Sequence, residues 1–398
     1  MESASGPVVT VDSDPLRLLG LGLIPQGSHV TVAVSGGGDS MAMLHALRPW
    51  AKANHTQLTA LSVDHRLRKE SADEAAFVAA VCKEHSLDHK TLTWDNPKRS
   101  QNLARQARHR LLAKAAFDLK SNYLFMGHTL SDVLETYVMR EMRESEPSKA
   151  VGPMPVSISP VWPEGRGLLI LRPLLFQTRS VLREWLRGKG YTWVEDPTNT
   201  DERYERPRIR KSLSHDQGFA TEPILNALER RASNEAPMAT ILRVCAETCD
   251  PYGLIRTPAT SPKSLLAELF SILIPAAAGT DRIPKAHARK DAASMLKTEK
   301  GHRLTLGGAW LQRSADEILI GRDPANVDHT CQSQVFDSRF ERSDATLLPK
   351  ETPPFLVRHA VPQGTHWRCL IADRLNLHAQ ALEANAAILT KRHATVPS

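Results

Sequence analysis

Cysteine is rare in this chain of 398 residues, and its five copies are scattered along the chain, with only Cys245 and Cys249 close in sequence. They form no CxxC pair and occupy positions Cys82, Cys245, Cys249, Cys331 and Cys369. Such a pattern offers neither the disulfide framework of a small secreted domain nor the paired ligands of a zinc or iron–sulfur site. Because reduced thiols are typical of the cytoplasm, we expect a cytoplasmic location.

Long apolar runs are missing as well. No stretch approaches the ~18 consecutive apolar residues that a membrane-spanning helix requires. The apolar stretch near the N-terminus, residues 18–24, is short and interrupted by glycine, and acidic residues precede it. We therefore expect neither a membrane span nor a secretory signal.

Acidic residues are outnumbered by basic ones, with 44 Asp and Glu against 51 Lys and Arg and a formal net charge of +7. An excess of this size permits a polyanionic partner such as nucleic acid, although it does not identify one. The chain is also long enough for two or three domains, at about 150 residues per domain.

Residues 29–195 predict an α/β domain. Short apolar runs of buried-strand type occur at residues 29–36, 58–65, 122–128 and 168–175. Between them, residues 70–85 begin with Ser71 and Glu74 at capping-box spacing, and residues 102–119 carry an apolar stripe on one face. That stripe consists of Leu103, Ala107, Leu111, Ala115 and Leu119. Strand–helix alternation predicts a doubly wound parallel sheet, with ligands at the carboxyl ends of its strands.

The remainder predicts a mainly helical domain and then a small mixed α/β region. Residues 198–211 are polar and charged, as expected at a domain boundary, and helical patterns follow in residues 212–300. Residues 303–311 and 316–323 predict a hairpin. We therefore expect a lead segment, a nucleotide-type domain, a mainly helical domain and a small C-terminal domain at residues 1–28, 29–210, 211–325 and 326–398.

The segment VAVSGGGDSM, residues 32–41, predicts a phosphate-binding loop. It places a Gly-rich turn between a buried strand and a helix, where backbone N–H groups and the helix dipole attract an anion. The candidate ATP-binding residues are Ser35, Gly36, Gly37, Gly38, Asp39 and Ser40. The glycines allow close approach of the backbone, and the serines add hydroxyl donors. Because Asp39 would repel a bare phosphate, it predicts a Mg²⁺ ion between its carboxylate and the phosphates.

Two better-known nucleotide loops do not fit these residues. A Walker A loop requires GxxxxGK[ST], and no lysine follows the glycines here. A dinucleotide fingerprint requires GxGxxG with a helix packed against its third glycine. A Gly-rich turn without any ligand is the remaining alternative, and three glycines followed by Asp-Ser directly after a buried strand argue against it.

The pattern S-G-G-x-D-S of residues 35–40 resembles the signature of the N-type ATP pyrophosphatases. Four further blocks are similar to the tRNA(Ile)-lysidine synthetases in particular, at residues 63–78, 104–112, 127–136 and 172–210. These blocks follow the family's order and cover about half of the chain, residues 30–210. The resemblance implies an adenine nucleotide α-hydrolase-like fold for this half.

The same resemblance implies a reaction in two steps. The enzyme would use ATP and Mg²⁺ to adenylate the C2 oxygen of the wobble cytidine in a tRNA(Ile) with a CAU anticodon. The ε-amine of free L-lysine would then displace AMP and leave lysidine. The expected partners are therefore tRNA(Ile) and L-lysine, and the oligomeric state stays open, a homodimer included.

The helix predicted after Ser131 carries the candidate catalytic residues other than Asp39. Asp132 and Glu135 are three residues apart, and Arg143 lies eleven residues beyond Asp132, so all three can face one side of the helix. Spacing alone would favour ordinary solvated charges. The resemblance favours a role for the two acids in holding the lysine amine or removing its proton, and Arg143 would then meet phosphate or tRNA.

Five other residues are candidate substrate contacts. His65 and Arg68 follow the second predicted strand, and His128 ends the third. Arg105 and Arg108 lie three residues apart on the preceding helix, where they could meet a phosphate or a carboxylate. A packed histidine and a basic surface face are the alternatives.

Arginines also cluster in the boundary segment, residues 198–211. We expect Arg206 and Arg210 to contact the tRNA backbone, and Tyr204 between the arginines could stack on a base. A charged connector between domains is the alternative. The basic run at residues 281–290 makes the same prediction with weaker support.

Three places depart from the family's pattern. Ser131 and Val133 replace an aspartate and a glutamine, and Arg66 replaces a glycine. In a loop after the helix, Glu144 and Glu146 stand where the family has glycines. Two alternatives therefore stay open, namely a tRNA-binding paralogue with lost or altered catalysis and another PP-loop enzyme that modifies tRNA.

Overall fold

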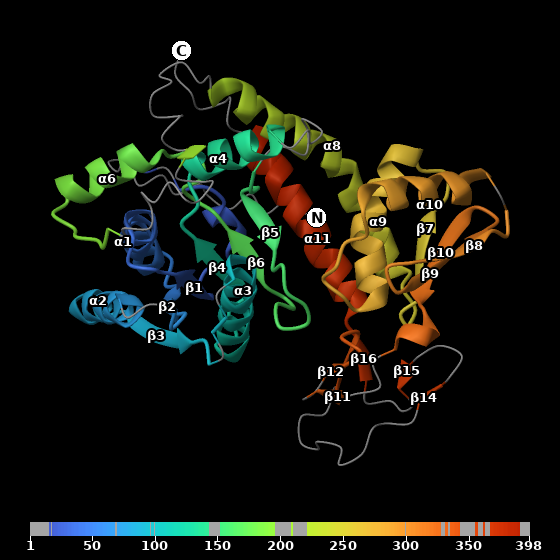
Figure 1. The fold of residues 1–398 in the computed structure, drawn as a ribbon, viewed down its shortest axis with the longest axis horizontal. Coiled ribbons are helices and arrows are strands. Elements are labelled where there is room, and N and C mark those ends of the chain that lie inside the picture. The colour runs from blue at the N-terminus through green and yellow to red at the C-terminus, as the bar shows by residue number, and fades with distance from the viewer. Residues whose placement is uncertain are drawn as a thin grey trace. The chain divides into compact units, whose positions relative to one another are not determined.

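Two units make up the chain, and Figure 1 shows their elements. The computed structural model describes residues 16, 18–67, 70–95, 97–98, 100–142, 152–195, 208–209, 221–298, 300–327, 331–332, 335–342, 355–356, 361–362 and 367–390. The N-terminal unit comprises residues 1–159, 168–234 and 384–398, and the C-terminal unit comprises residues 160–167 and 235–383. The four domain boundaries expected from the sequence stay a prediction.

A six-stranded, mostly parallel sheet forms the centre of the N-terminal unit and confirms the predicted α/β class. Its strands are β1 (His29–Ala33), β2 (Gln57–Asp64), β3 (Asp88–Thr93), β4 (Tyr123–Met126), β5 (Val156–Ile158) and β6 (Leu169–Leu171). The order is β3-β2-β1-β4-β6-β5, and β5 alone among these six runs antiparallel to its neighbour. The two edge strands, β3 and β5, were not expected, because β3 is largely exposed and polar and β5 is only three residues long.

Helices connect the parallel strands, as such connections require. They are α1 (Gly38–Ala53), α2 (Glu70–Glu84), α3 (Gln101–Asp118) and α4 (Leu130–Glu141). A further helix, α6 (Arg179–Gly188), follows β6, and a 3₁₀ turn, η1 (Leu21–Leu23), precedes β1. Val30, Val32 and Phe125 on the central strands are fully buried, as expected for a sheet covered on both faces.

The strand order creates a switch point between β1 and β4. The chain leaves β1 toward β2 and β3 and then returns to β4 on the other side of β1. Ligands of open α/β sheets bind outside the carboxyl ends of the strands at such a point. The Gly-rich loop follows β1, and residues 127–129 follow β4, so the topology brings these two segments to one place.

One local prediction for the helices is wrong, and one predicted helix has an apolar stripe that is covered only in part. Helix α2 begins at Glu70 rather than after Ser71, and the Ser71 hydroxyl donates to Asp64 Oδ1 at 2.5 Å instead of capping the helix. The apolar stripe of α3 is buried only in part, since Ala115 is covered whereas Leu103 is 38% exposed. A stripe is typical of a core face, but sequence periodicity cannot tell where the covering elements end.

The C-terminal unit contains α9 (Lys263–Ala278), α10 (Ala286–Thr298) and a four-stranded antiparallel sheet in the order β7-β10-β9-β8 (Figure 1). Its strands are β7 (Ile255–Pro258), β8 (Arg303–Leu306), β9 (Ala309–Ser314) and β10 (Glu317–Arg322). The hairpin predicted from residues 303–323 is confirmed and extended by β7. Helices α8 (Thr221–Glu247) and α11 (Ile371–Thr390) contribute residues to both units. Because α8, α9 and α10 follow one another between residues 221 and 298, the predicted helical middle of the chain is confirmed.

Short strands complete the C-terminal unit. They are β11 (Cys331–Gln332), β12 (Val335–Phe336), β13 (Phe340–Arg342), β14 (Phe355–Leu356), β15 (Val361–Pro362) and β16 (Trp367–Cys369), after a 3₁₀ turn, η3 (Pro324–Asn326). Four of them form a small antiparallel sheet in the order β11-β12-β13-β16, and β14 pairs with β15. Within the described part of the chain, no helix combines the length and apolarity needed to cross a membrane.

A side chain of α11 closes the edge of the central sheet. The backbone N–H of Val156 on β5 donates to Asn385 Oδ1 at 2.8 Å, and Asn385 Nδ2 donates to the Val156 carbonyl at 2.9 Å. The amide thus pairs both backbone groups of one edge residue, as a neighbouring strand would. Asn385 is 3% exposed, so water cannot replace these bonds.

Replacing Asn385 by Ala would leave both Val156 backbone groups buried without partners. We expect it to lower the free energy of unfolding by about 1–3 kcal/mol, the cost of such unsatisfied groups. Urea denaturation and hydrogen exchange at the Val156 amide measure the effect, with exposed Asn102→Ala as the control. Equal stability and equal exchange in both variants would contradict the role of Asn385.

Candidate active site

The Gly-rich loop has the conformation of a phosphate-binding turn. Gly36 has a φ of +87°, in the left-handed region that favours glycine, and α1 begins directly after Gly37. The Ser40 hydroxyl donates to the Gly37 carbonyl at 2.9 Å and accepts from the Ser35 N–H at 3.2 Å. The loop is therefore fixed by its own side chains, and the first backbone N–H groups of α1, which have no partner within a helix, are available to an anion.

A cavity of about 510 Å³ lies at this edge of the sheet. Residues 33–35 and 37–40 line it together with the end of β2 and side chains from α2, α3, α4 and α6. Its volume falls within the range of about 300–1,000 Å³ that is typical of small-molecule sites. The cavity is therefore large enough for a nucleotide.

Gly127 allows the two sides of this site to approach each other. A Cβ atom at this position would stand 2.9 Å from the carbonyl oxygen of Asp39, closer than real Cβ contacts. Only glycine can therefore hold the end of β4 against the first turn of α1. The consequence is that α4, which starts three residues later, places its acids beside Asp39.

Arg179, the first residue of α6, joins three acids from two other helices. Its Nε donates to Asp39 Oδ2 at 2.9 Å, its Nη2 to Asp132 Oδ1 at 2.6 Å and its Nη1 to Glu135 Oε1 at 2.5 Å. The arginine side chain is 18% exposed and the Glu135 side chain 1%. We call these four residues the Arg179 cluster.

The Arg179 cluster has an excess of negative charge. When the acids are ionised, three carboxylates face one guanidinium. Burial raises the pKa of Asp39, although Arg179 beside it acts in the opposite direction. Burial also acts to raise the pKa of Asp132, but Arg179, His128 and hydrogen bonds from Thr129 outweigh it and hold that pKa below its usual value. The site therefore favours a further cation, most strongly next to Asp39.

Asp39 fits the requirements of a magnesium site. Among the described residues, no group of three or more His, Cys, Asp or Glu side chains could hold a metal ion by itself. Mg²⁺ is commonly bound by one or two carboxylates together with substrate phosphates, and it retains several waters. The partly buried carboxylate of Asp39, beside a phosphate-binding turn, can provide the protein's share of such a site.

Another part of the cavity wall is basic. Arg105 and Arg108 of α3 line it, and Arg172 lies buried behind His128, donating from Nε to His128 Nδ1 at 3.2 Å. Burial and Arg172 lower the pKa of His128 to about 3, and burial and Arg108 lower the pKa of His65. His128 is therefore neutral at physiological pH, and the arginines provide the positive charge that an anion would meet.

The structure brings most of the predicted site residues to one cavity. It is lined by His65, Arg105, Arg108, His128, Asp132 and loop residues 35 and 37–40. Gly36 shapes the loop, and Glu135 is joined to the cavity through Arg179. Four predicted residues, Arg68, Arg143, Arg206 and Arg210, lie outside the described residues and stay predictions, as do the effects of Glu144 and Glu146.

Sequence reasoning missed the residues that organise this site. Arg172 and Arg179 are the two ends of the block RPLLFQTR, which the sequence presents as a family pattern without indicating which side chains it serves. The segment after α6 was also missed. The Val194 N–H donates to the Gly36 carbonyl at 2.9 Å, and Glu195 pairs with Arg183 at 3.0 Å at the rim of the cavity.

Comparisons with known proteins agree with this geometry. The model of the PP-loop domain matches residues 17–217. The chain is 33% identical over 308 residues to the tRNA(Ile)-lysidine synthase of Hyphomonas neptunium, covering 75% of this chain and 84% of that one. It is 35% identical to the enzyme of that name from Brucella anthropi and 36% identical to that from Caulobacter vibrioides, over 72% and 74% of this chain. The matches cover 66% of each of these two longer relatives.

Replacing Arg179 by Gln would leave three acids close together without their shared cation, with Asp132 and Glu135 buried and Asp39 partly buried. We expect a loss of about 3–5 kcal/mol in the free energy of unfolding at pH 7, as for other broken buried ion pairs. The loss should shrink as the pH falls, first toward the raised pKa of Asp39 and then toward the lowered pKa of Asp132, because Arg179 stabilises only the ionised forms of these carboxyls. Thermal unfolding at pH 7 and pH 5 provides the measurement.

Arg183→Gln on the same helix is the matched control. Its partner Glu195 is largely exposed, so we expect a change of about 0–1 kcal/mol. If both variants lost the same stability at both pH values, the Arg179 cluster would not be the feature that stabilises the site.

Proposed function

The chain belongs to the tRNA(Ile)-lysidine synthase family of ATP-using, tRNA-modifying ligases, and on this premise we propose that it forms lysidine on tRNA(Ile). In detail, L-lysine is joined to C2 of the wobble cytidine of a CAU-anticodon tRNA(Ile) through an adenylated tRNA, with release of AMP and pyrophosphate. One observation carries the proposal, namely that a phosphate-binding loop, an acidic cluster and a basic wall share a single cavity.

In this proposal the loop of residues 35–40 holds the triphosphate. Backbone N–H groups at the start of α1 and the serine hydroxyls donate to phosphate oxygens. Mg²⁺, bound by Asp39 and the phosphates, would neutralise the charge that develops on the leaving pyrophosphate. The residues of the chain thus bind and orient ATP so that its α-phosphate faces the cytidine oxygen.

Lysine suits the two ends of the cavity. The ε-ammonium group of lysine can be held by Asp132 and Glu135, which already bind a cationic group, the Arg179 guanidinium. Its carboxylate can pair with Arg105 and Arg108 on the basic wall. Attack on the adenylated cytidine requires a neutral ε-amine, so one of the two acids would accept its proton, as a base within hydrogen-bond reach can.

Two departures from the family pattern are compatible with this role. Val133, where the family has glutamine, is fully buried in a core cluster with Leu130 and Leu175 rather than at the cavity. Arg66, where the family has glycine, has a φ of +50°, and its backbone N–H donates to Asp64 Oδ1 at 2.8 Å. The position therefore retains the left-handed conformation that favours glycine.

Contacts with the rest of the tRNA also belong to the proposal. Arg68, Arg143, Arg206 and Arg210 remain the sequence-based candidates for its phosphates. A cytoplasmic location follows from an RNA substrate of this kind. A tRNA-binding paralogue without turnover is the alternative outcome of the test.

The test combines the purified chain with Mg²⁺, ATP, L-lysine and an unmodified CAU-anticodon tRNA(Ile) transcript. We expect lysidine and AMP in equal amounts, measured by mass spectrometry of the digested tRNA and by chromatography of the nucleotides. Asp39→Asn should lower the rate by a factor of about 10²–10³, similar to the loss of one electrostatic group at a reacting centre. Its ATP affinity should fall most at low Mg²⁺ concentration.

Asp118→Asn serves as the control, because this exposed acid pairs only with Lys114 one turn away on α3 among the contacts described. It should leave both products unchanged. AMP without lysidine would point to another nucleophile or base. Bound tRNA without either product would favour the paralogue that binds without turnover.

A further inference from the structure

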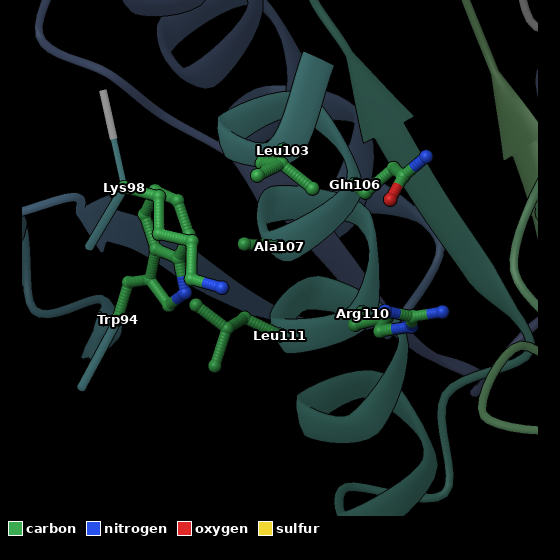
Figure 2. A pocket seen from close by; sticks show the side chains of 7 residues that line it. All are labelled: Trp94, Lys98, Leu103, Gln106, Ala107, Arg110 and Leu111. Atoms are coloured by element: carbon green, nitrogen blue, oxygen red, sulfur yellow. The ribbon is translucent and has the colours of Figure 1, made fainter. Parts of the chain in front are cut away.

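A second pocket lies on the outer side of α3 and has no part in the chemistry proposed above. It encloses about 330 Å³ and is lined mainly by Trp94, Lys98, Leu103, Ala107, Arg110 and Leu111. Figure 2 shows Trp94 and Lys98 beside the helix, with Ala107 and Leu111 between them and the helix axis. We call it the Trp94 pocket.

Helix α3 separates this pocket from the active-site cavity. Residues 103, 107 and 111 lie on one face of the helix, because 3.6 residues make one turn. Arg105, Arg108 and Leu112, which line the active-site cavity, lie on roughly the opposite face. One helix therefore contributes a basic face to the active site and an apolar face to the Trp94 pocket.

The apolar face of α3 is more exposed to solvent than is usual for an apolar stripe on a helix. Leu103 is 38% exposed, and Ala107, Leu111 and Trp94 are only partly buried. The backbone of Trp94 is fixed, since its backbone N–H donates to the Asp64 carbonyl at 3.0 Å and continues the pairing of β3 with β2, and the indole ring itself packs edge to face against His65. A fixed aromatic ring beside an aliphatic floor offers a flat base two apolar surfaces between which to stack.

Charge identifies the class of ligand. Lys98 and Arg110 at the rim are exposed, and none of the described residues that line the pocket is acidic. Aromatic rings combined with positive charge are the usual means of binding single-stranded nucleic acid, in which bases stack and phosphates meet the cations. The volume is near the lower end of ligand sites, about 300 Å³, which suits one base rather than a larger molecule.

One side-chain pair connects the pocket with the active site. The Trp94 ring packs edge to face against His65, with the ring centroids 5.9 Å apart and an interplanar angle of 87°. His65 lines the active-site cavity, whereas Trp94 lines the second pocket. The two spaces are thus separated at this point by a wall of two rings, so neighbouring nucleotides of one strand could occupy both.

We propose that the Trp94 pocket binds the base of an unpaired nucleotide that neighbours the modified cytidine in the RNA substrate. This inference rests on the proposed function, because that function provides the single-stranded anticodon loop. The base stacks on Trp94, and Lys98 and Arg110 lie near its phosphates. The pocket thereby positions the loop so that the cytidine reaches the active-site cavity.

The experiment measures the affinity of the full-length chain for a fluorescent stem–loop RNA with the anticodon arm of CAU tRNA(Ile). Trp94→Ala should weaken binding about 5- to 150-fold, which corresponds to the ~1–3 kcal/mol of one base stack. Trp94→Tyr should bind nearly as well as the unaltered chain, because tyrosine also stacks. Phe117→Ala is the matched control, since Phe117 is an exposed aromatic on the same helix that lines neither pocket.

A set of RNAs with one abasic loop position each gives a readout that a merely structural role of Trp94 would not produce. We expect one abasic position beside the cytidine to weaken binding to the unaltered chain and to have little further effect on Trp94→Ala, because the two changes remove the same contact. Additive losses at every loop position would overturn the inference. So would equal affinity of Trp94→Ala and the unaltered chain.

Two measures keep this test separate from others. If Trp94→Ala does not fold, Leu103→Glu at an exposed position places a negative charge in the pocket and should weaken RNA binding in the same way; unchanged binding would overturn the inference. The unaltered chain is also assayed for lysidine. If lysidine forms but the losses of affinity from Trp94→Ala and from the abasic positions are additive, only the role of the Trp94 pocket is rejected. If the unaltered chain neither forms lysidine nor binds the RNA, both the proposed function and this inference are rejected.

Discussion

The Arg179 guanidinium holds together the parts of the active site that come from different strands. Asp39 follows β1, Asp132 and Glu135 follow β4, and Arg179 follows β6. Carboxylates buried this close together would repel one another without a shared cation. The guanidinium compensates part of that repulsion and fixes the carboxylate positions through directional hydrogen bonds. The acidic part of the cavity therefore depends on Arg179, a residue that follows the last strand of the sheet in the sequence.

Burial gives the cavity two ends of opposite character. On one side, three acids share one arginine. On the other, Arg105 and Arg108 stand near His65 and His128, whose pKa values are lowered by burial, so these histidines add no charge. A zwitterionic amino acid and a magnesium-bound triphosphate both require such a division, since each combines positive and negative groups.

Backbone geometry sets the scale of the site. Gly127 brings the end of β4 against the first turn of α1, where a Cβ atom would stand 2.9 Å from the Asp39 carbonyl oxygen. Arg66 retains a left-handed conformation in this chain even with a long side chain, because Asp64 accepts its N–H. Family patterns thus record conformations that the backbone requires, and a different residue can be accepted where the surroundings stabilise the same conformation.

The sequence by itself determined the local features of this protein. Apolar runs predicted β1, β2, β4 and β6, the Gly-rich segment predicted the turn between β1 and α1, and the family blocks predicted the helix with Asp132 and Glu135. Each of these signals lies within a few neighbouring residues, in a strand or helix period or in the conformational freedom of glycine. The tertiary structure alone decided that Arg179 joins acids up to 140 positions away, that Asn385 closes the edge of β5, and that the stripe of α3 is half uncovered. Such contacts depend on the order of the strands in the sheet and on which elements pack against each other, and the spacing of residues along the chain predicts neither.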